Sequence, residues 1–196
     1  MLVLIVGPSG AGKDTLLGAA RVALADEPRV RFVRRVVTRS ASGPGADEAF
    51  LDEAEFHARC DANEFALWWH AHGLFYGVPA DIAGDVAAGR VVVASVSRAV
   101  LAEAAARFPV RVVEITAPRE VLASRLAARG REDAEAVAER LSRIVAIPEG
   151  IGVSAIVNDG TVEEGARALV ALLRKIMGEA GRAGRAGMQT GIGGER

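Results

Sequence analysis

The segment with the clearest chemistry is a glycine-rich run that ends in a lysine, GPSGAGKDT. Its glycines let the backbone turn tightly, so that successive N–H groups surround a triphosphate, and Lys13 adds a full positive charge for the β- and γ-phosphates. A glycine-rich turn with a chance lysine is the alternative, but a strand-like segment precedes the run and a helical pattern follows it. The predicted ATP-binding loop consists of Gly7, Pro8, Ser9, Gly10, Ala11, Gly12, Lys13, Asp14 and Thr15.

The residue after the lysine departs from the usual pattern of such loops. Ser or Thr normally follows the lysine and holds Mg²⁺ through its hydroxyl, whereas this chain has Asp14 and then Thr15. A carboxylate repels phosphates unless it faces the metal, directly or through water, or lies against the helix N-terminus. We predict a Mg²⁺ contact at Asp14, and a phosphate or metal contact at Thr15.

Arginine clusters form a second signature, because phosphoryl transfer depends on neutralising charge on the transferred group. One cluster is Arg34, Arg35 and Arg39, and another surrounds Gly130 with Arg125, Arg129 and Arg131. For the second cluster, a solvated helix face paired with nearby acids is the alternative. Beside a phosphate loop, we interpret it as a lid at about 125–143 that closes over the γ-phosphate. The predicted catalytic residues are Lys13, Arg125, Arg129 and Arg131.

These residues need a scaffold, and the apolar pattern predicts an α/β fold with a parallel sheet flanked by helices, as in P-loop NTPases. Strand-like runs occur at Leu2–Val6, Val91–Ser95, Val110–Thr116 and Ala155–Val157, and helical patterns follow them, beginning with Lys13–Leu24. Two further helices, at 119–129 and 133–147, meet at Gly130.

The segment from 31 to 89 interrupts this alternation. It holds a strand-like stretch at Arg31–Thr38, a loop at Ser40–Ala46 and extended aromatic pieces at Phe65–His70 and Leu74–Val78. We predict an inserted acceptor-binding lobe at about 31–89, in a single domain spanning 1–177. The glycine-rich residues 178–196 predict a disordered tail.

Composition limits the partners. The 196 residues suit one domain, and 24 Lys+Arg against 25 Asp+Glu give no general attraction to nucleic acid or an anionic membrane. A single cysteine, Cys60, excludes an internal disulfide, and the apolar start is too short to span a bilayer. We expect a cytoplasmic protein that binds a small phosphorylated molecule; the oligomeric state stays open.

The order of the motifs along about Leu2–Met177 resembles the guanylate kinase-like family. The motifs are GPSGAGKD, VTRS at Val37–Ser40, FYG at Phe75–Gly77, RLAARGRE at Arg125–Glu132 and VNDG at Val157–Gly160. The resemblance implies that Arg39 and Tyr76 bind the acceptor phosphate, that RLAARGRE is the lid, and that Asn158 and Asp159 lie near the adenine of ATP.

The departures from that family concern the base. Guanylate kinases read guanine with acids at positions that correspond here to Leu67, Ser95 and Ser97. A leucine accepts no hydrogen bond, and each buried hydrogen bond lost costs about 1–3 kcal/mol. The lobe is therefore poorly suited to guanine.

A narrower resemblance is to the ribose 1,5-bisphosphate phosphokinases, a family associated with phosphonate breakdown. GPSGAGKDTL, TRSAS, WHAHGLFYGV at Trp69–Val78 and the pair Ser97–Arg98 carry it. It implies transfer of the γ-phosphoryl of ATP to ribose 1,5-bisphosphate, giving phosphoribosyl diphosphate (PRPP) and ADP. We assign Arg39 and Tyr76 to one acceptor phosphate, and Arg98 with Ser97 to the other, because ligands of open α/β sheets lie beyond strand ends.

Two alternatives stay open. A divergent guanylate or other nucleoside monophosphate kinase is disfavoured by Leu67 and Ser97. A non-catalytic guanylate kinase-like binding module is disfavoured because such modules tend to lose the loop lysine and glycines, which this chain keeps at Gly7, Gly12 and Lys13. ATP consumption separates the enzymes from the module.

Overall fold

The central layer is a parallel sheet, seen in a computed structural model that describes residues 1–39, 48–127 and 146–189, with side chains up to 182. Its strand order is β2 (Val30–Phe32), β7 (Val91–Ser95), β1 (Leu2–Val6), β8 (Val110–Thr116) and β9 (Gly152–Val157). All four pairings are parallel. The predicted runs at Leu2–Val6, Val91–Ser95 and Val110–Thr116 are strands with those bounds, and β9 begins earlier than predicted.

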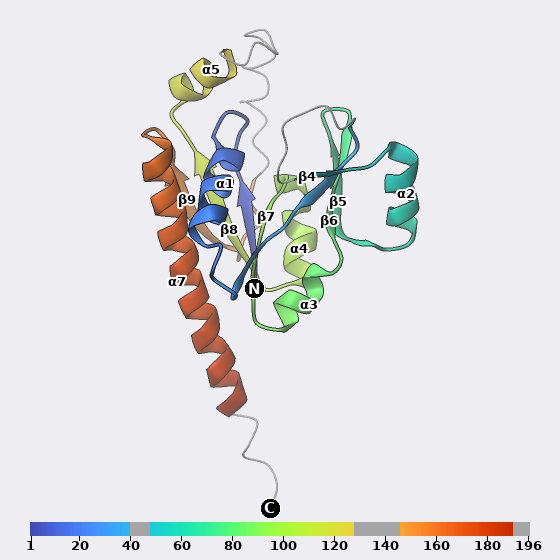
Figure 1. Ribbon diagram of the computed structural model, residues 1–196, viewed down its shortest axis with the longest axis vertical. Helices are drawn as coiled ribbons and strands as arrows, with labels where there is room; N and C mark the ends of the chain where they lie inside the picture. Colours follow the sequence, from blue (N-terminus) through green and yellow to red (C-terminus); the bar gives the residue numbers. More distant parts are fainter. Residues whose placement is uncertain (40–47, 128–145, 190–196) are drawn as a thin grey trace, which may run out of the picture.

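The apolar strands are continuous because helices and a second sheet cover both faces. On one face, Val3 and Ile5 pack with α1 (Lys13–Ala23) and α7 (Val162–Gln189). On the other, Leu2 and Leu4 pack with α3 (Ile82–Ala87), α4 (Leu101–Arg107) and the second sheet. Figure 1 shows α7 along one side of the molecule and the second sheet on the opposite side.

The second sheet forms the lobe and has the order β4 (Glu48–Phe50), β3 (Arg35–Val37), β6 (Leu74–Pro79) and β5 (Phe65–Ala71), with α2 (Glu53–Asp61) beside it. The predicted single strand at Arg31–Thr38 is two strands in two sheets. The Val33 N–H still bonds the Val93 carbonyl of the main sheet, whereas Val36 already pairs with Gly77 of the lobe. The backbone changes partner within three residues, so the lobe sheet begins at Arg35.

The C-terminal helix corrects the predicted tail. Residues 178–189 continue α7 instead of forming a disordered segment. Two contacts hold its path: Glu179 accepts a hydrogen bond from Arg111 at 3.2 Å, and Ala180 packs against the core. Residues 190–196 lie outside the described part.

Only the first residues of the predicted lid, at about 125–143, lie among the described residues. Helix α5 (Arg119–Ala127) covers most of the first predicted helix, while nearly all of the second, at 133–147, falls outside the described residues. None of the helices in the described ranges has the length and apolar character needed to cross a bilayer.

Candidate active site

The predicted ATP-binding loop joins β1 to α1, and its glycines are required by close packing. A Cβ on Gly7, where φ is 149°, would lie 1.9 Å from the carbonyl oxygen of Ile115. Gly12 has a left-handed φ of 84°, and a Cβ there would lie 2.6 Å from Nδ2 of Asn158. No other residue fits either position, so the sequence pattern follows from the path of the backbone.

The loop is arranged for an anion. The Lys13 ammonium donates to the carbonyl oxygens of Gly7 at 2.7 Å and Pro8 at 3.0 Å, which holds its charge against the loop. Helix α1 begins at Lys13, and its N-cap residue, Gly12, has no side chain with which to bond the N–H groups of the first turn. The N–H groups of the first turn are thus oriented towards the loop, where phosphate groups bind well.

Asp14 and Thr15 are exposed in the first turn of α1 and offer the hard oxygen ligands that Mg²⁺ takes alongside substrate phosphates. The donor set therefore fits the ion. The structure also gives Asp14 a neighbour that the sequence did not indicate, since its Oδ1 lies 3.7 Å from Nη2 of Arg35. A cation from the lobe thus offsets the carboxylate next to the phosphate loop.

Asn158 follows β9 and lies beneath the loop with 5% of its surface exposed. Its Nδ2 donates to the Ala11 carbonyl at 2.8 Å, and its backbone N–H donates to the Thr116 carbonyl at 2.7 Å. The resemblance implies a place near the adenine, whereas the observed contacts are with the backbone of the loop. Asp159, the next residue, is exposed.

Arg125 of α5 contacts Asn158 as well. Its Nη1 donates to the Asn158 carbonyl at 3.0 Å, so the first turns of the predicted lid are tied to the residue that supports the loop. The other two predicted catalytic arginines, Arg129 and Arg131, lie outside the described residues.

On the acceptor side, strand pairing brings the predicted residues together. Val37 of β3 lies opposite Tyr76 of β6, which places Arg39 near the tyrosine. Tyr76 stacks on Trp69, with ring centroids 5.4 Å apart. Burial raises the pKa of Tyr76, so its hydroxyl stays protonated at neutral pH and available as a donor.

Glu48, which the sequence analysis missed, is the centre of this half of the site. Its Oε2 accepts from Nη2 of Arg39 at 2.5 Å, and its Oε1 accepts from Nη2 of Arg35 at 2.8 Å. Arg35 and Glu48 are direct partners in the β3–β4 ladder. Arg35 and Arg39 are four residues apart, so extended backbone places them on the same face, and this spacing could have indicated Arg35 from the sequence. Strand β4 has only three residues, and its pattern does not indicate a role for Glu48.

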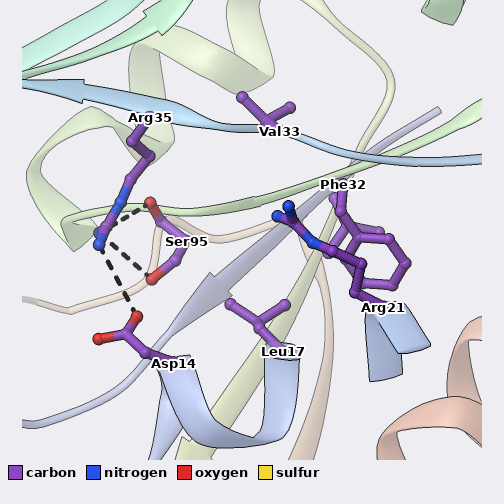
Figure 2. Close-up of a pocket in the computed structure, with 8 residues that line it drawn as sticks. Asp14, Leu17, Arg21, Phe32, Val33, Arg35 and Ser95 are labelled. Atoms are coloured by element: carbon purple, nitrogen blue, oxygen red, sulfur yellow. Dashed lines mark hydrogen bonds and ion pairs between the residues drawn. The ribbon is translucent and has the colours of Figure 1, made fainter. Parts of the chain in front are cut away.

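Figure 2 shows Arg35 reaching from β3 towards Asp14 of α1 and Ser95 of β7. These three residues line one pocket, whose wall continues through Leu17, Arg21, Phe32, Val33 and Val93. Nη1 of Arg35 lies 3.3 Å from the Ser95 carbonyl and 3.5 Å from its hydroxyl. The guanidinium therefore stands between the ATP loop and the lobe.

The other predicted acceptor residues lie at the carboxyl end of β7. The Ser97 hydroxyl accepts from the Ala99 N–H at 3.3 Å and caps the short helix η1 (Arg98–Val100). Arg98 donates to the carboxylate of Glu114 on β8. Arg98 and Arg39 resemble each other, because each has one carboxylate partner and a buried Nε–H with no acceptor among the described residues.

The positions tied to base recognition carry no acid. Leu67 is fully buried in the core between the sheet and the lobe, and Ser95 is 6% exposed. A leucine in this place contributes packing and no hydrogen bond, which agrees with the expectation that the lobe is unsuited to guanine.

Comparison with known proteins identifies close relatives. A ribose 1,5-bisphosphate phosphokinase PhnN from Methylobacterium radiotolerans is 53% identical over 179 residues, which cover 88% of this chain and 97% of that protein. One from Brucella melitensis is 47% identical over 176 residues, 89% of this chain and 92% of that protein. A search of protein-family models found no match.

Among solved structures, the guanylate kinase from Anaplasma phagocytophilum superposes with a TM-score of 0.62. It is 21% identical, over 90% of this chain and 86% of that one, and thus shows a shared fold. The predicted α/β fold of the guanylate kinase-like kinases is confirmed.

Proposed function

The chain belongs to the ribose 1,5-bisphosphate phosphokinase family, and on that basis we propose that it transfers the γ-phosphoryl of ATP to ribose 1,5-bisphosphate, producing PRPP and ADP. The observation that carries the proposal is the pairing of two unlike halves. A lysine-capped phosphate loop faces a lobe in which arginines held by Glu48 are present and a base-reading acid at Leu67 is missing.

The donor half holds the triphosphate of ATP. Lys13, the loop N–H groups and the N-terminus of α1 bind the β- and γ-phosphates and stabilise the charge that develops on the leaving ADP oxygen. Arg125, Arg129 and Arg131 serve as the lid arginines. Asn158 contributes by keeping the loop backbone in place, because its amide is committed to the Ala11 carbonyl.

The acceptor half presents a phosphate oxygen to the γ-phosphorus. A bond forms from that oxygen to the γ-phosphorus while the bond to the β–γ bridging oxygen breaks, and the electron pair leaves with ADP. Arg39 and Tyr76 bind one acceptor phosphate, and Arg98 with Ser97 binds the other. No general base is required, because the attacking oxygen is already anionic at neutral pH.

Asp14 and Thr15 would hold Mg²⁺, which would supply positive charge to offset that of the ATP phosphates. We place the reaction in the cytoplasm, where ATP is available and a single cysteine such as Cys60 stays reduced. Its metabolic role is in phosphonate breakdown.

An ADP-release assay with four acceptors tests the proposal: ribose 1,5-bisphosphate, ribose 5-phosphate, GMP and AMP. We expect turnover with the first, at least tenfold above the others, and a product with the mass of PRPP. Preferred turnover of GMP would replace this function with that of a guanylate kinase. No ATP consumption with any acceptor would favour a binding module.

A further inference from the structure

Arg35 has no assigned role in the proposed reaction, yet it occupies the junction of the two halves. It belongs to the lobe strand β3, but its guanidinium contacts Ser95 at the carboxyl end of β7 and lies near Asp14 in the first turn of α1. Ligands of open parallel sheets bind at these carboxyl ends. A cation here is adjacent to the donor loop and to the acceptor lobe at once.

The contacts of Arg35 leave its binding capacity partly unused. Among its contacts with the described residues, only the bond to Glu48, at 2.8 Å, has the length of a strong charge-assisted hydrogen bond. The Ser95 contacts, at 3.3 and 3.5 Å, are at the long end, and Asp14 at 3.7 Å is beyond hydrogen-bond distance. The side chain is 15% exposed, so it is held in place and still reachable from the pocket.

The local charge also favours an added anion. Within residues 1–39 and 48–127, Glu48 provides one negative charge for two guanidinium groups, those of Arg35 and Arg39. Asp14 offsets part of this surplus, but its carboxylate is 76% exposed and weakly coupled to the arginine. A phosphate oxygen beside Nη1 or Nη2 would complete the pairing.

We propose that Arg35 binds the acceptor phosphate that faces the nucleotide loop. The inference rests on the proposed function for the identity of the acceptor, but not for the chemistry, which is recognition of a phosphate monoester by a guanidinium. Because Arg35 lies next to Asp14, a phosphate bound to it would lie close to the γ-phosphate of ATP.

The test measures binding by calorimetry, without turnover, for wild type and Arg35→Gln. We expect the dissociation constant of ribose 1,5-bisphosphate to rise about 10- to 100-fold, as befits a lost charge-assisted bond, and that of ADP to change less than about twofold. The matched control is Arg29→Gln, which removes an exposed arginine paired with Glu27 and leaves both constants unchanged.

A second variant separates binding from support of the fold. In Arg35→Gln, Glu48 keeps Arg39 as its partner, so the variant is compared with Glu48→Gln and with the double variant in a double-mutant cycle. If Arg35 contacts the phosphate itself, its removal in the Glu48→Gln background weakens acceptor binding further. No further loss in that background would mean that Arg35 acts only by supporting Glu48 and would overturn the proposal. So would an acceptor affinity unchanged in Arg35→Gln, or an equal loss of ADP affinity.

The same titrations distinguish this proposal from the proposed function. If the wild type binds GMP and ignores ribose 1,5-bisphosphate, the function is wrong, and the Arg35 variants are scored with GMP, whose phosphate the same guanidinium must then bind. A GMP affinity unaffected by Arg35→Gln would reject the Arg35 proposal as well.

Discussion

The nucleotide loop and the acceptor lobe are built by different means. The loop is fixed by backbone: left-handed glycines, carbonyls bonded by Lys13, and the amide of Asn158 on the Ala11 carbonyl. The lobe site is fixed mainly by side chains, because the Glu48 carboxylate joins Arg35 to Arg39, and the backbone contact of these guanidinium groups, from Arg35 to the Ser95 carbonyl, is longer at 3.3 Å.

This difference separates triphosphate binding, which kinases of this fold share, from the choice of acceptor, which is specific to each of them. A backbone cradle binds any triphosphate, since it contacts phosphate oxygens only. A side-chain network changes with single substitutions and therefore allows one fold to serve different acceptors. Substitutions in the loop should then impair the use of ATP with every acceptor, whereas substitutions in the lobe should change acceptor use alone.

The largest effect is expected for Lys13→Ala. Loss of the charge that stabilises the γ-phosphate should lower kcat about 10²- to 10³-fold while the acceptor dissociation constant stays near wild type. ADP release measures kcat, and calorimetry measures binding. The control is Lys175→Ala, which removes an exposed lysine of α7 and should leave kcat unchanged. A tenfold loss of acceptor binding in Lys13→Ala would contradict the division between the two regions.

Asn158→Asp should have the next largest effect. It replaces a buried donor by a carboxylate oxygen facing the Ala11 carbonyl, so ATP should bind about 10- to 100-fold more weakly. If Asn158 holds the loop, the Asn158→Asp variant binds inorganic tripolyphosphate more weakly by the same factor as ATP. If Asn158 contacts adenine, the affinity for tripolyphosphate is preserved. Asn63→Asp, at an exposed turn, serves as the control and should change neither ligand.

Glu48→Gln tests the lobe. An amide holds one arginine where the carboxylate holds two, so the acceptor KM should rise about tenfold while the KM for ATP stays unchanged. Steady-state kinetics with each substrate varied in turn measures both. Glu53→Gln, an exposed acid of α2, is the matched control. A lower acceptor KM would mean that Glu48 competes with the phosphate and would reverse its role.

The same contrast explains what the sequence could predict. The loop, three of the main strands and the outline of the fold follow from local patterns, because glycine spacing and apolar runs reflect the conformation of their own segment. Glu48 was missed because its role arises from pairing with Arg35, 13 residues away, in a three-residue strand. The neighbour of Asp14 was missed for the same reason.

The tail shows a third kind of limit. Glycines spaced along 178–189 predict disorder, since each weakens a helix by about 1 kcal/mol relative to alanine. Contacts of Glu179 and Ala180 with the sheet and core offset that preference at the start of the segment. Such contacts join distant parts of the chain and leave no local trace.

The smallest predicted effect concerns a second ion-pair network, at the opposite edge of the sheet. Asp85 of α3 accepts hydrogen bonds from Arg31 of β2 and, at 2.7 Å, from Arg90 at the amino end of β7. Its chemistry resembles that of Glu48, but ligands bind at the carboxyl ends. Asp85→Asn should therefore lower the free energy of unfolding by about 1 kcal/mol and leave both KM values unchanged.

The pH dependence identifies this contribution. Hydrogen bonding to Arg31 lowers the pKa of Asp85 below its ordinary 3.8, so the stabilisation is complete above that value and is lost as the pH falls through the lower folded-state pKa. Urea unfolding at pH 7 and at pH 3 should show the difference between wild type and Asp85→Asn shrinking at the lower pH. An equal difference at both pH values would mean that packing, not charge, makes Asp85 important for stability. A raised acceptor KM in Asp85→Asn would mean that ion pairs far from the carboxyl ends of the strands also shape the acceptor site.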